Sequence, residues 1–143
     1  MRIDGEWYLC DDGIVRPILR AEIESGLGTW VPFELLVDTG ADRTVISSNV
    51  LGILQIAAQE AEDQIGGIGG AADTVEVSTQ IRLTRETGQK VKLRGRFAAC
   101  VDPQLLDMSV LGRDVLDLFA VIVDRPGDTI ALVGQQHRYS IST

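Results

Sequence analysis

The sequence predicts a single, mostly β domain, and three observations lead to that prediction. A chain of 143 residues suits one domain with a proper core and leaves little room for two. Residues 74–83 and 91–97 alternate between apolar and polar side chains with a period of two, the pattern of half-exposed strands. Strand signals recur every 8–12 residues or so, which favours a closed or sandwiched β architecture over a parallel α/β one.

Two strands are expected in the first part of the chain. Residues 14–23 and 29–37 are rich in apolar and β-branched side chains. Each segment contains a proline, Pro17 in the first and Pro32 in the second. Because proline cannot donate to a sheet ladder, these prolines indicate edge positions or strand starts.

Helical signals are scarce, and they predict two short helices. Ser47 or Ser48 is placed to cap a helix that runs through Leu54. Residues 112–119 form the second predicted helix, with apolar residues at helical spacing. These apolar residues are Val115, Leu118 and Phe119.

Two β-hairpins are predicted in the second half of the chain. The strands at 74–83 and 91–97 are joined by a turn with Gly88 at its tip. Residues 119–124 and 129–133 flank Arg-Pro-Gly-Asp, another turn signal.

Charge and composition narrow the classes of partner. The formal net charge of −8 argues against a nucleic acid and against an anionic membrane surface, since both require clusters of Lys and Arg. No apolar run is long enough to span a bilayer, and the N-terminal segment lacks the apolar centre of a signal peptide. Cys10 and Cys100 are too few for a disulfide framework. We therefore expect reduced thiols in a cytoplasmic protein.

The strand at 29–37 ends abruptly at Asp38, which begins the string Asp-Thr-Gly-Ala-Asp. By itself this string has two interpretations. Asp38 is either an ordinary turn-forming residue at a strand end or a carboxylate that the strand holds in place for chemistry.

The glycine-rich segment 64–73, Gln-Ile-Gly-Gly-Ile-Gly-Gly-Ala-Ala-Asp, also has several interpretations. Gly67, Gly69 and Ala72 fit a dinucleotide fingerprint, but the strand pattern that follows contradicts the helix which that motif requires. A phosphate-binding loop would need a Lys-Ser/Thr pair, which is absent. The segment then remains either the tip of a long hairpin that closes over a bound chain, or a connecting loop without a partner.

Three motifs in this order resemble the retroviral-type, or retropepsin-like, aspartic proteases. The string Leu36–Asp42 matches the family's catalytic motif, 65–70 matches its glycine-rich flap, and Val110–Arg113 matches the apolar pair with Gly-Arg before its helix. The resemblance covers roughly residues 14–123. It implies an all-β acid-protease fold, closed and barrel-like, with a flap hairpin and one or two short helices.

The resemblance also implies catalytic residues and a second chain. Asp38, Thr39 and Gly40 would be the catalytic residues, with two Asp38 carboxylates activating a water. The sequence contains no second Asp-Thr/Ser-Gly string, so the other carboxylate must come from another copy. We expect a homodimer that hydrolyses polypeptides at its two-fold axis, without a cofactor or a metal. The rival interpretation is an inactive module of the same fold that dimerises or binds peptides.

Further site residues follow from the same resemblance. Two of them, Gly112 and Arg113, would support the site, with Arg113 pairing with Asp42. Arg43 either lines a specificity pocket or is a solvated surface residue. The residues expected to bind substrate are Ala41, Asp42, Arg43, Ile65, Gly66, Gly67, Ile68 and Gly69.

The two ends of the chain allow two different dimer interfaces. We expect one domain over 1–143, with a core at about 14–123, an extension at 1–13, and a hairpin and tail at 124–143. The interface is formed either by interleaved terminal strands or by the hairpin at 119–133.

Overall fold

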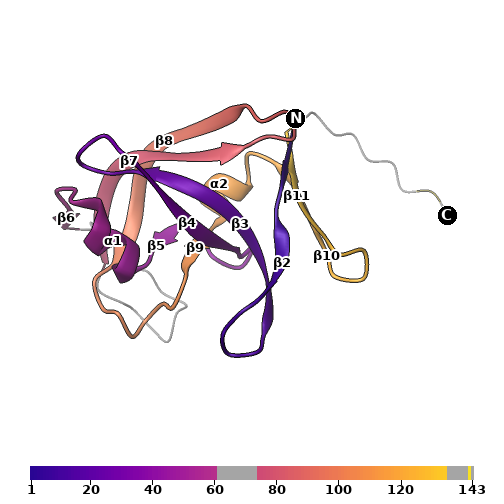
Figure 1. Ribbon diagram of the computed structural model, residues 1–143, viewed down its shortest axis with the longest axis horizontal. Coiled ribbons are helices and arrows are strands. Elements are labelled where there is room, and N and C mark those ends of the chain that lie inside the picture. The colour runs from indigo at the N-terminus through magenta and orange to yellow at the C-terminus, as the bar shows by residue number, and fades with distance from the viewer. Residues whose placement is uncertain (61–73, 135–141, 143) are drawn as a thin grey trace.

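The computed structural model describes residues 1–60, 74–134 and 142, and it is built mainly from strands (Figure 1). Two short helices accompany them, α1 (Ser48–Leu54) and α2 (Arg113–Leu116). No helix in the described part of the chain is both long and apolar enough to cross a membrane. The strands are β1 (Arg2–Asp4), β2 (Glu6–Leu9), β3 (Val15–Glu24), β4 (Trp30–Val37), β5 (Val45–Ile46), β6 (Gln59–Glu60), β7 (Thr74–Thr84), β8 (Lys90–Cys100), β9 (Ser109–Leu111), β10 (Ala120–Asp124) and β11 (Thr129–Val133).

The predicted closed β architecture is confirmed. Eight strands form one sheet in the order β2-β3-β4-β9-β5-β8-β7-β6, and β3 also pairs with β7 through Ile23 and Ile81. This extra pairing joins the two ends of the series from β3 to β7, so the sheet closes on itself. A second, three-stranded sheet has the order β1-β11-β10.

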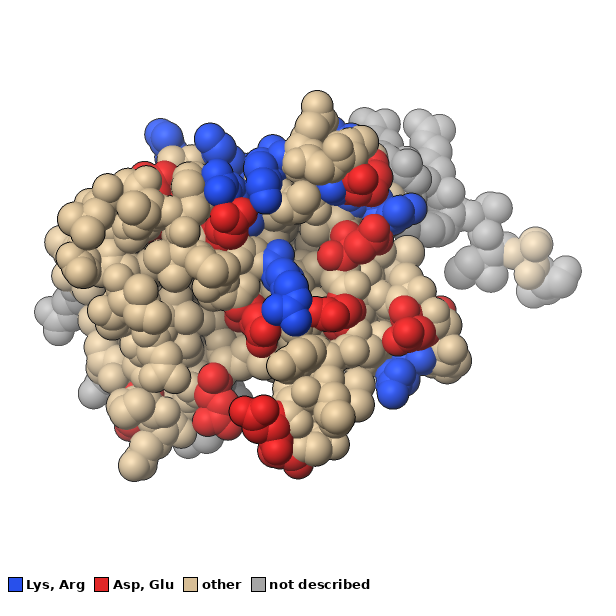
Figure 2. Space-filling model, viewed as in Figure 1, with Lys and Arg blue, Asp and Glu red and all other residues tan. Residues whose placement is uncertain are grey.

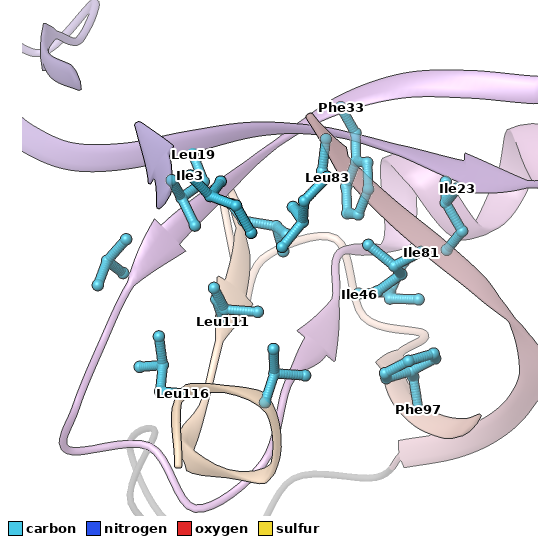
Figure 3. Close-up of a cluster of buried hydrophobic side chains, with 14 of the residues drawn as sticks. Ile3, Leu19, Ile23, Phe33, Ile46, Ile81, Leu83, Phe97, Leu111 and Leu116 are labelled. Carbon is cyan, nitrogen blue, oxygen red and sulfur yellow. The ribbon is translucent and has the colours of Figure 1, made fainter. Parts of the chain in front are cut away.

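The inward faces of the closed sheet form one hydrophobic core (Figure 3). Alternation places every second residue of β4 from Phe33 to Val37 inside, and the period-two segments of the sequence contribute Val77, Ile81, Leu83 and Phe97 to the core. Aliphatic side chains dominate, and Phe33 and Phe97 are the two buried aromatic residues among the described ones. The fully buried side chains include Ile18, Leu19, Ile23, Leu35, Ile46, Leu54, Ile81, Leu83 and Leu111.

Both predicted hairpins are present. β7 and β8 pair along their whole length, with Val77 opposite Phe97, and Gly88 in the connecting turn has a φ of +86° that suits glycine. β10 and β11 form the second hairpin, in which Val121 lies opposite Leu132.

The two prolines lie where a missing N–H does not interrupt a ladder. Each is the third residue of its strand, Pro17 in β3 and Pro32 in β4. Pro17 pairs with β2 only, because pairing of β3 with β4 begins one residue later at Ile18. Pro32 pairs with β3 only, because pairing of β4 with β9 begins at Leu35.

The second helix is shorter than predicted, and this part of the prediction is wrong. α2 contains four residues and ends at Leu116 instead of continuing to Phe119. The N–H groups of Leu118 and Phe119 bond to carbonyls three residues back, so the chain tightens and turns into β10. Leu118 is consequently 63% exposed and does not share a buried helix face with Val115.

The N-terminal residues belong to the fold. β1 pairs with β11, and Ile3 in β1 is 1% exposed within the main core. β2 pairs with the start of β3. The segment expected to be an extension therefore supplies two strands to this chain.

Candidate active site

The predicted catalytic turn lies between two strands that a third strand separates. β9 lies between β4 and β5, parallel to β4 and antiparallel to β5. Segment 38–44, which joins β4 to β5, therefore has to cross the end of β9. The Asp38 N–H donates a 3.1 Å hydrogen bond to the carbonyl of Leu111, the last residue of β9.

Asp38 is held by its own turn. The Gly40 N–H donates a 2.9 Å hydrogen bond to Asp38 Oδ1, and the Ala41 N–H donates to the Asp38 carbonyl at 3.2 Å. A Cβ on Gly40 would lie 3.2 Å from Asp38 Oδ1, which is a close approach, so glycine leaves the carboxylate uncrowded. Asp38 is half-buried, whereas Thr39 and Gly40 are exposed.

Thr44 and Asp114 connect the catalytic turn to α2. Asp114 Oδ1 accepts hydrogen bonds from the Thr44 N–H at 2.8 Å and from the Thr44 hydroxyl at 2.7 Å. The same oxygen accepts a 2.9 Å bond from the Val115 N–H, and Thr44 Oγ1 accepts a 3.2 Å bond from the Gly112 N–H. Thr44 is fully buried, so these bonds satisfy polar groups that water does not reach.

Sequence reasoning missed Thr44 and Asp114. One signal was present, because Asp114 occupies the first turn of a predicted helix, where a carboxylate is favoured. Its bond to Thr44 joins residues 70 positions apart, which no local pattern reveals.

Gly112 is required by close backbone contact. A Cβ at this position would overlap the carbonyl group of Arg43 and would lie 2.8 Å from the Thr44 nitrogen. The backbone of Gly112 is extended, with a φ of −100°, so the constraint is space and not conformation.

The structure brings Asp42 and Arg113 together, as the resemblance to the protease family led us to expect. Arg113 Nη2 contacts Asp42 Oδ1, and the Arg113 N–H donates to the Ala41 carbonyl at 2.9 Å. Both side chains are exposed, so the ion pair contributes little to stability and serves mainly to orient the two groups. The backbone bond attaches the start of α2 to the catalytic turn.

Arg43 lies against the β7–β8 hairpin. Its Nη1 is 3.2 Å from Glu76 Oε1, and Nη2 donates a 3.4 Å hydrogen bond to the Arg96 carbonyl. Glu76 also accepts a 2.6 Å hydrogen bond from Arg96 Nη2, and its side chain is only 11% exposed. Arg43 is thus a paired residue that connects the catalytic turn to the hairpin, and its role in a specificity pocket stays a prediction.

The predicted flap residues lie outside the described residues. These are Ile65, Gly66, Gly67, Ile68 and Gly69. The strands on either side of that segment are antiparallel neighbours, with Gln59 of β6 opposite Glu76 of β7. In residues 1–60 and 74–134, no group of three or more His, Cys, Asp or Glu side chains is placed to hold a metal ion.

Comparisons with known proteins identify a family and a fold. The family model for retroviral aspartyl protease matches residues 14–123. A comparison with curated protein sequences finds no match to this chain. Among solved structures, EIAV protease complexed with the inhibitor HBY-793 is 26% identical, with 71% of this chain and 86% of that chain covered and a TM-score of 0.52. A retropepsin-like aspartic protease from Rickettsia conorii is 17% identical, covers 92% of this chain and 89% of its own, and has a TM-score of 0.53.

Proposed function

Because this chain belongs to the retroviral aspartyl protease family, with a match that spans most of its length, we propose that it is a homodimeric aspartic endopeptidase. The observation that carries the proposal is the state of Asp38. Its carboxylate is half-buried and oriented by Gly40, and from the described residues it accepts only this one hydrogen bond. A carboxylate held in this way at the surface suits a reaction that requires a second group from outside the chain.

The second group would be Asp38 of another copy. Aspartic proteases place two carboxylates about 3 Å apart, and two such groups cannot both ionise, so they share one proton. The ionised carboxylate takes a proton from a water, and that water attacks the peptide carbonyl. The protonated carboxylate supports the developing oxyanion. The pair titrates as a unit, and no single pKa belongs to either Asp38.

The neighbouring residues would have separate roles. Thr39 is exposed, so its hydroxyl is accessible to the other copy. A hydrogen bond from this hydroxyl across the dimer would stabilise the two paired turns. Gly40 leaves room for the scissile peptide. Asp42, oriented by Arg113, would contact the substrate backbone. Ala41 would line the site, and the amide of Ile68 would hold a water against the substrate carbonyls.

The edge of β10 is the surface that we propose for dimerisation. β10 pairs only with β11 among the described strands, which leaves its other edge open. Ile122 and Val123 on this strand are 42% and 45% exposed, and β10 lies at one side of the molecule (Figure 1). β1 pairs within its own chain, which favours the hairpin at 119–133 over an interface of interleaved N-terminal strands.

The test is cleavage of a diverse peptide library between about pH 4 and 8 by the protein and by Asp38→Asn, with the dimer measured by sedimentation. Cleavage that is lost in the variant supports the protease. A stable dimer that cleaves nothing at any pH would favour the peptide-binding module instead. Cleavage by a clean monomer would contradict the shared site.

The pH profile provides a second test. A Ser or Thr at position 41 could donate a hydrogen bond to the carboxylates and lower their pKa values, whereas Ala41 cannot. We therefore expect activity to extend towards neutral pH, which suits the cytoplasmic location predicted from the sequence. An optimum below about pH 3 would contradict this expectation.

A further inference from the structure

A row of cations follows the outer face of β8, and its last member, Arg96, shares Glu76 with Arg43 of the catalytic turn. Lys90, Lys92, Arg94 and Arg96 occupy alternate positions of the strand and are all exposed. Alternate residues of a strand point to the same side and lie roughly 7 Å apart, so the four side chains form a line about 20 Å long. Figure 2 shows Lys and Arg side chains gathered along the upper edge of the molecule, over the β7–β8 hairpin of Figure 1. We call these four residues the basic face.

The neighbouring strand does not neutralise this row. The β7 residues directly opposite the four cations are Thr84, Arg82, Gln80 and Ser78, none of which is acidic. Glu22 of β3 reaches one end of the row, where it pairs with Lys90 and with Arg82. Glu76 reaches the other end and pairs with Arg96. The two central cations, Lys92 and Arg94, have no ion pair among the described residues.

Cations without a carboxylate partner are unusual in this acidic chain. Acidic residues outnumber basic ones by 21 to 13, so a cation finds a carboxylate easily. Away from the basic face, cations on several different elements each have a carboxylate within 4 Å. These pairs are Arg2–Asp4, Arg16–Asp12, Arg20–Glu6, Arg43–Glu76, Arg113–Asp42 and Arg125–Asp128. Lys92 and Arg94 therefore have no carboxylate partner among the described residues, and Lys92 Nζ lies 5.9 Å from the centre of the Trp30 ring.

A cleft of about 630 Å³ adjoins one end of the basic face. Arg94 and Arg96 line one wall, Gln80 lies beside them on β7, and Gln55 and Ile56 line another part. The side-chain amides and the guanidinium groups supply hydrogen-bond donors for an extended backbone and for carboxylates. Glu24 also lines the cleft, but its carboxylate accepts a 3.1 Å hydrogen bond from Gln80. The cleft thus continues the row of donors and gives a bound chain a place to enter.

We propose that the basic face and the adjoining cleft bind an acidic, extended peptide segment of a partner polypeptide. A row of about 20 Å matches roughly six residues of extended chain, and alternate acidic side chains of that chain would meet the cations at the same spacing. The net charge of −8 opposes long polyanions and anionic membranes, which would have to approach the whole molecule. A short acidic segment meets only the local cations. The proposal does not depend on peptide hydrolysis, because none of these residues belongs to the proposed catalytic site.

The experiment is fluorescence anisotropy with a labelled octapeptide of alternating Glu and Ser. The protein carries Asp38→Asn so that cleavage cannot consume the probe, and a Gln-for-Glu octapeptide is the matched neutral probe. The variant Lys92→Gln/Arg94→Gln removes the two central cations. Arg2→Gln/Arg125→Gln removes the same charge from elsewhere and serves as the control. Thermal unfolding of each variant checks that the fold is retained.

We expect the Glu probe to bind more tightly than the Gln probe and to weaken as salt is raised, because the contacts are exposed ion pairs. Lys92→Gln/Arg94→Gln should weaken binding of the Glu probe by roughly fivefold, whereas the control pair should change it by less than about twofold. Equal binding of the two probes, or an equal loss in both variants, would overturn the proposal. Preferential binding of a DNA duplex or a phosphatidylserine vesicle, lost in Lys92→Gln/Arg94→Gln, would also overturn it.

Discussion

The segment that joins β4 to β5 has two sides. Contacts within the chain support the side at Thr44, whereas the side at Asp38 presents groups that have few partners in the chain. On one side, the buried Thr44 donates its hydroxyl hydrogen bond to Asp114 and accepts one from the Gly112 N–H. On the other side, the Asp38 carboxylate accepts one hydrogen bond from the described residues, and Thr39 is exposed. The Thr44 side holds the turn rigid from within the chain, while the Asp38 side presents the groups that the proposed reaction requires. Substitutions on the two sides should therefore separate stability from activity.

The largest effect on activity is expected from Asp38→Asn. Loss of the shared proton and of the base should lower kcat/KM by a factor of about 10² to 10⁴ or more. The melting temperature should change little, because an amide oxygen can still accept the hydrogen bond from Gly40. Peptide cleavage and thermal unfolding of the same preparations measure the two quantities. Retained activity would contradict the assignment of Asp38.

Gly112→Ala should have the largest effect on stability. The added Cβ overlaps the Arg43 carbonyl group, so the turn and β9 must move apart, at a cost of about 3 kcal/mol in the free energy of unfolding. Chemical denaturation measures this cost.

Gly52→Ala in α1 is the matched control for Gly112→Ala. A Cβ at Gly52 meets nothing within 4 Å, and alanine favours a helix over glycine by about 1 kcal/mol. Equal destabilisation by the two substitutions would show that the close approach at Gly112 is unimportant.

Asp114→Ala tests the hydrogen bonds that connect the catalytic turn to α2. It removes the acceptor for two backbone N–H groups and for the Thr44 hydroxyl, and it should cost about 2 kcal/mol. Asp114→Asn keeps an oxygen in place and should cost less than half as much. Denaturant titration distinguishes the two, and identical losses would argue that the hydrogen bonds contribute little.

Thr39→Val should affect assembly more than folding. The hydroxyl is exposed in the single chain, so the change should leave monomer stability within about 0.5 kcal/mol. If the hydroxyl bonds across the dimer, the dissociation constant measured by sedimentation should rise by roughly tenfold. Thr87→Val, in the turn between β7 and β8, is the control. The same dissociation constant in both variants would place Thr39 outside the interface.

The smallest effect concerns Glu22, a carboxylate remote from both sides of the turn. The Arg82 guanidinium, and then Lys90, lower the pKa of Glu22 to about 2. A lowered pKa in the folded state adds stability above the ordinary value near 4.5, and this stability is lost as the pH falls towards 2. Glu22→Gln should therefore show a slightly flatter fall in stability across that range. A curve parallel to that of the unsubstituted protein would contradict the paired role of Glu22.

Local patterns predicted the hairpins well, because the information for them lies in neighbouring residues. The alternation of β7 and β8 and the glycine of their turn were enough to predict a hairpin, whereas the register that pairs Val77 with Phe97 came from the structure. The same local information overestimated α2. Apolar spacing allows a helix to Phe119, but the chain has to turn into β10, and Leu118 ends up exposed.

The sequence by itself determined that this chain has one Asp-Thr-Gly turn at the end of a strand, a mostly β fold, and an excess of acid. Only the tertiary structure decided what supports that turn. The contacts of Thr44 with Asp114, of Arg43 with Glu76, and of β4 with β9 join residues 33 to 74 positions apart. Such contacts depend on how the sheet closes, because a residue's neighbours in a barrel are set by strand order and register and not by proximity along the chain.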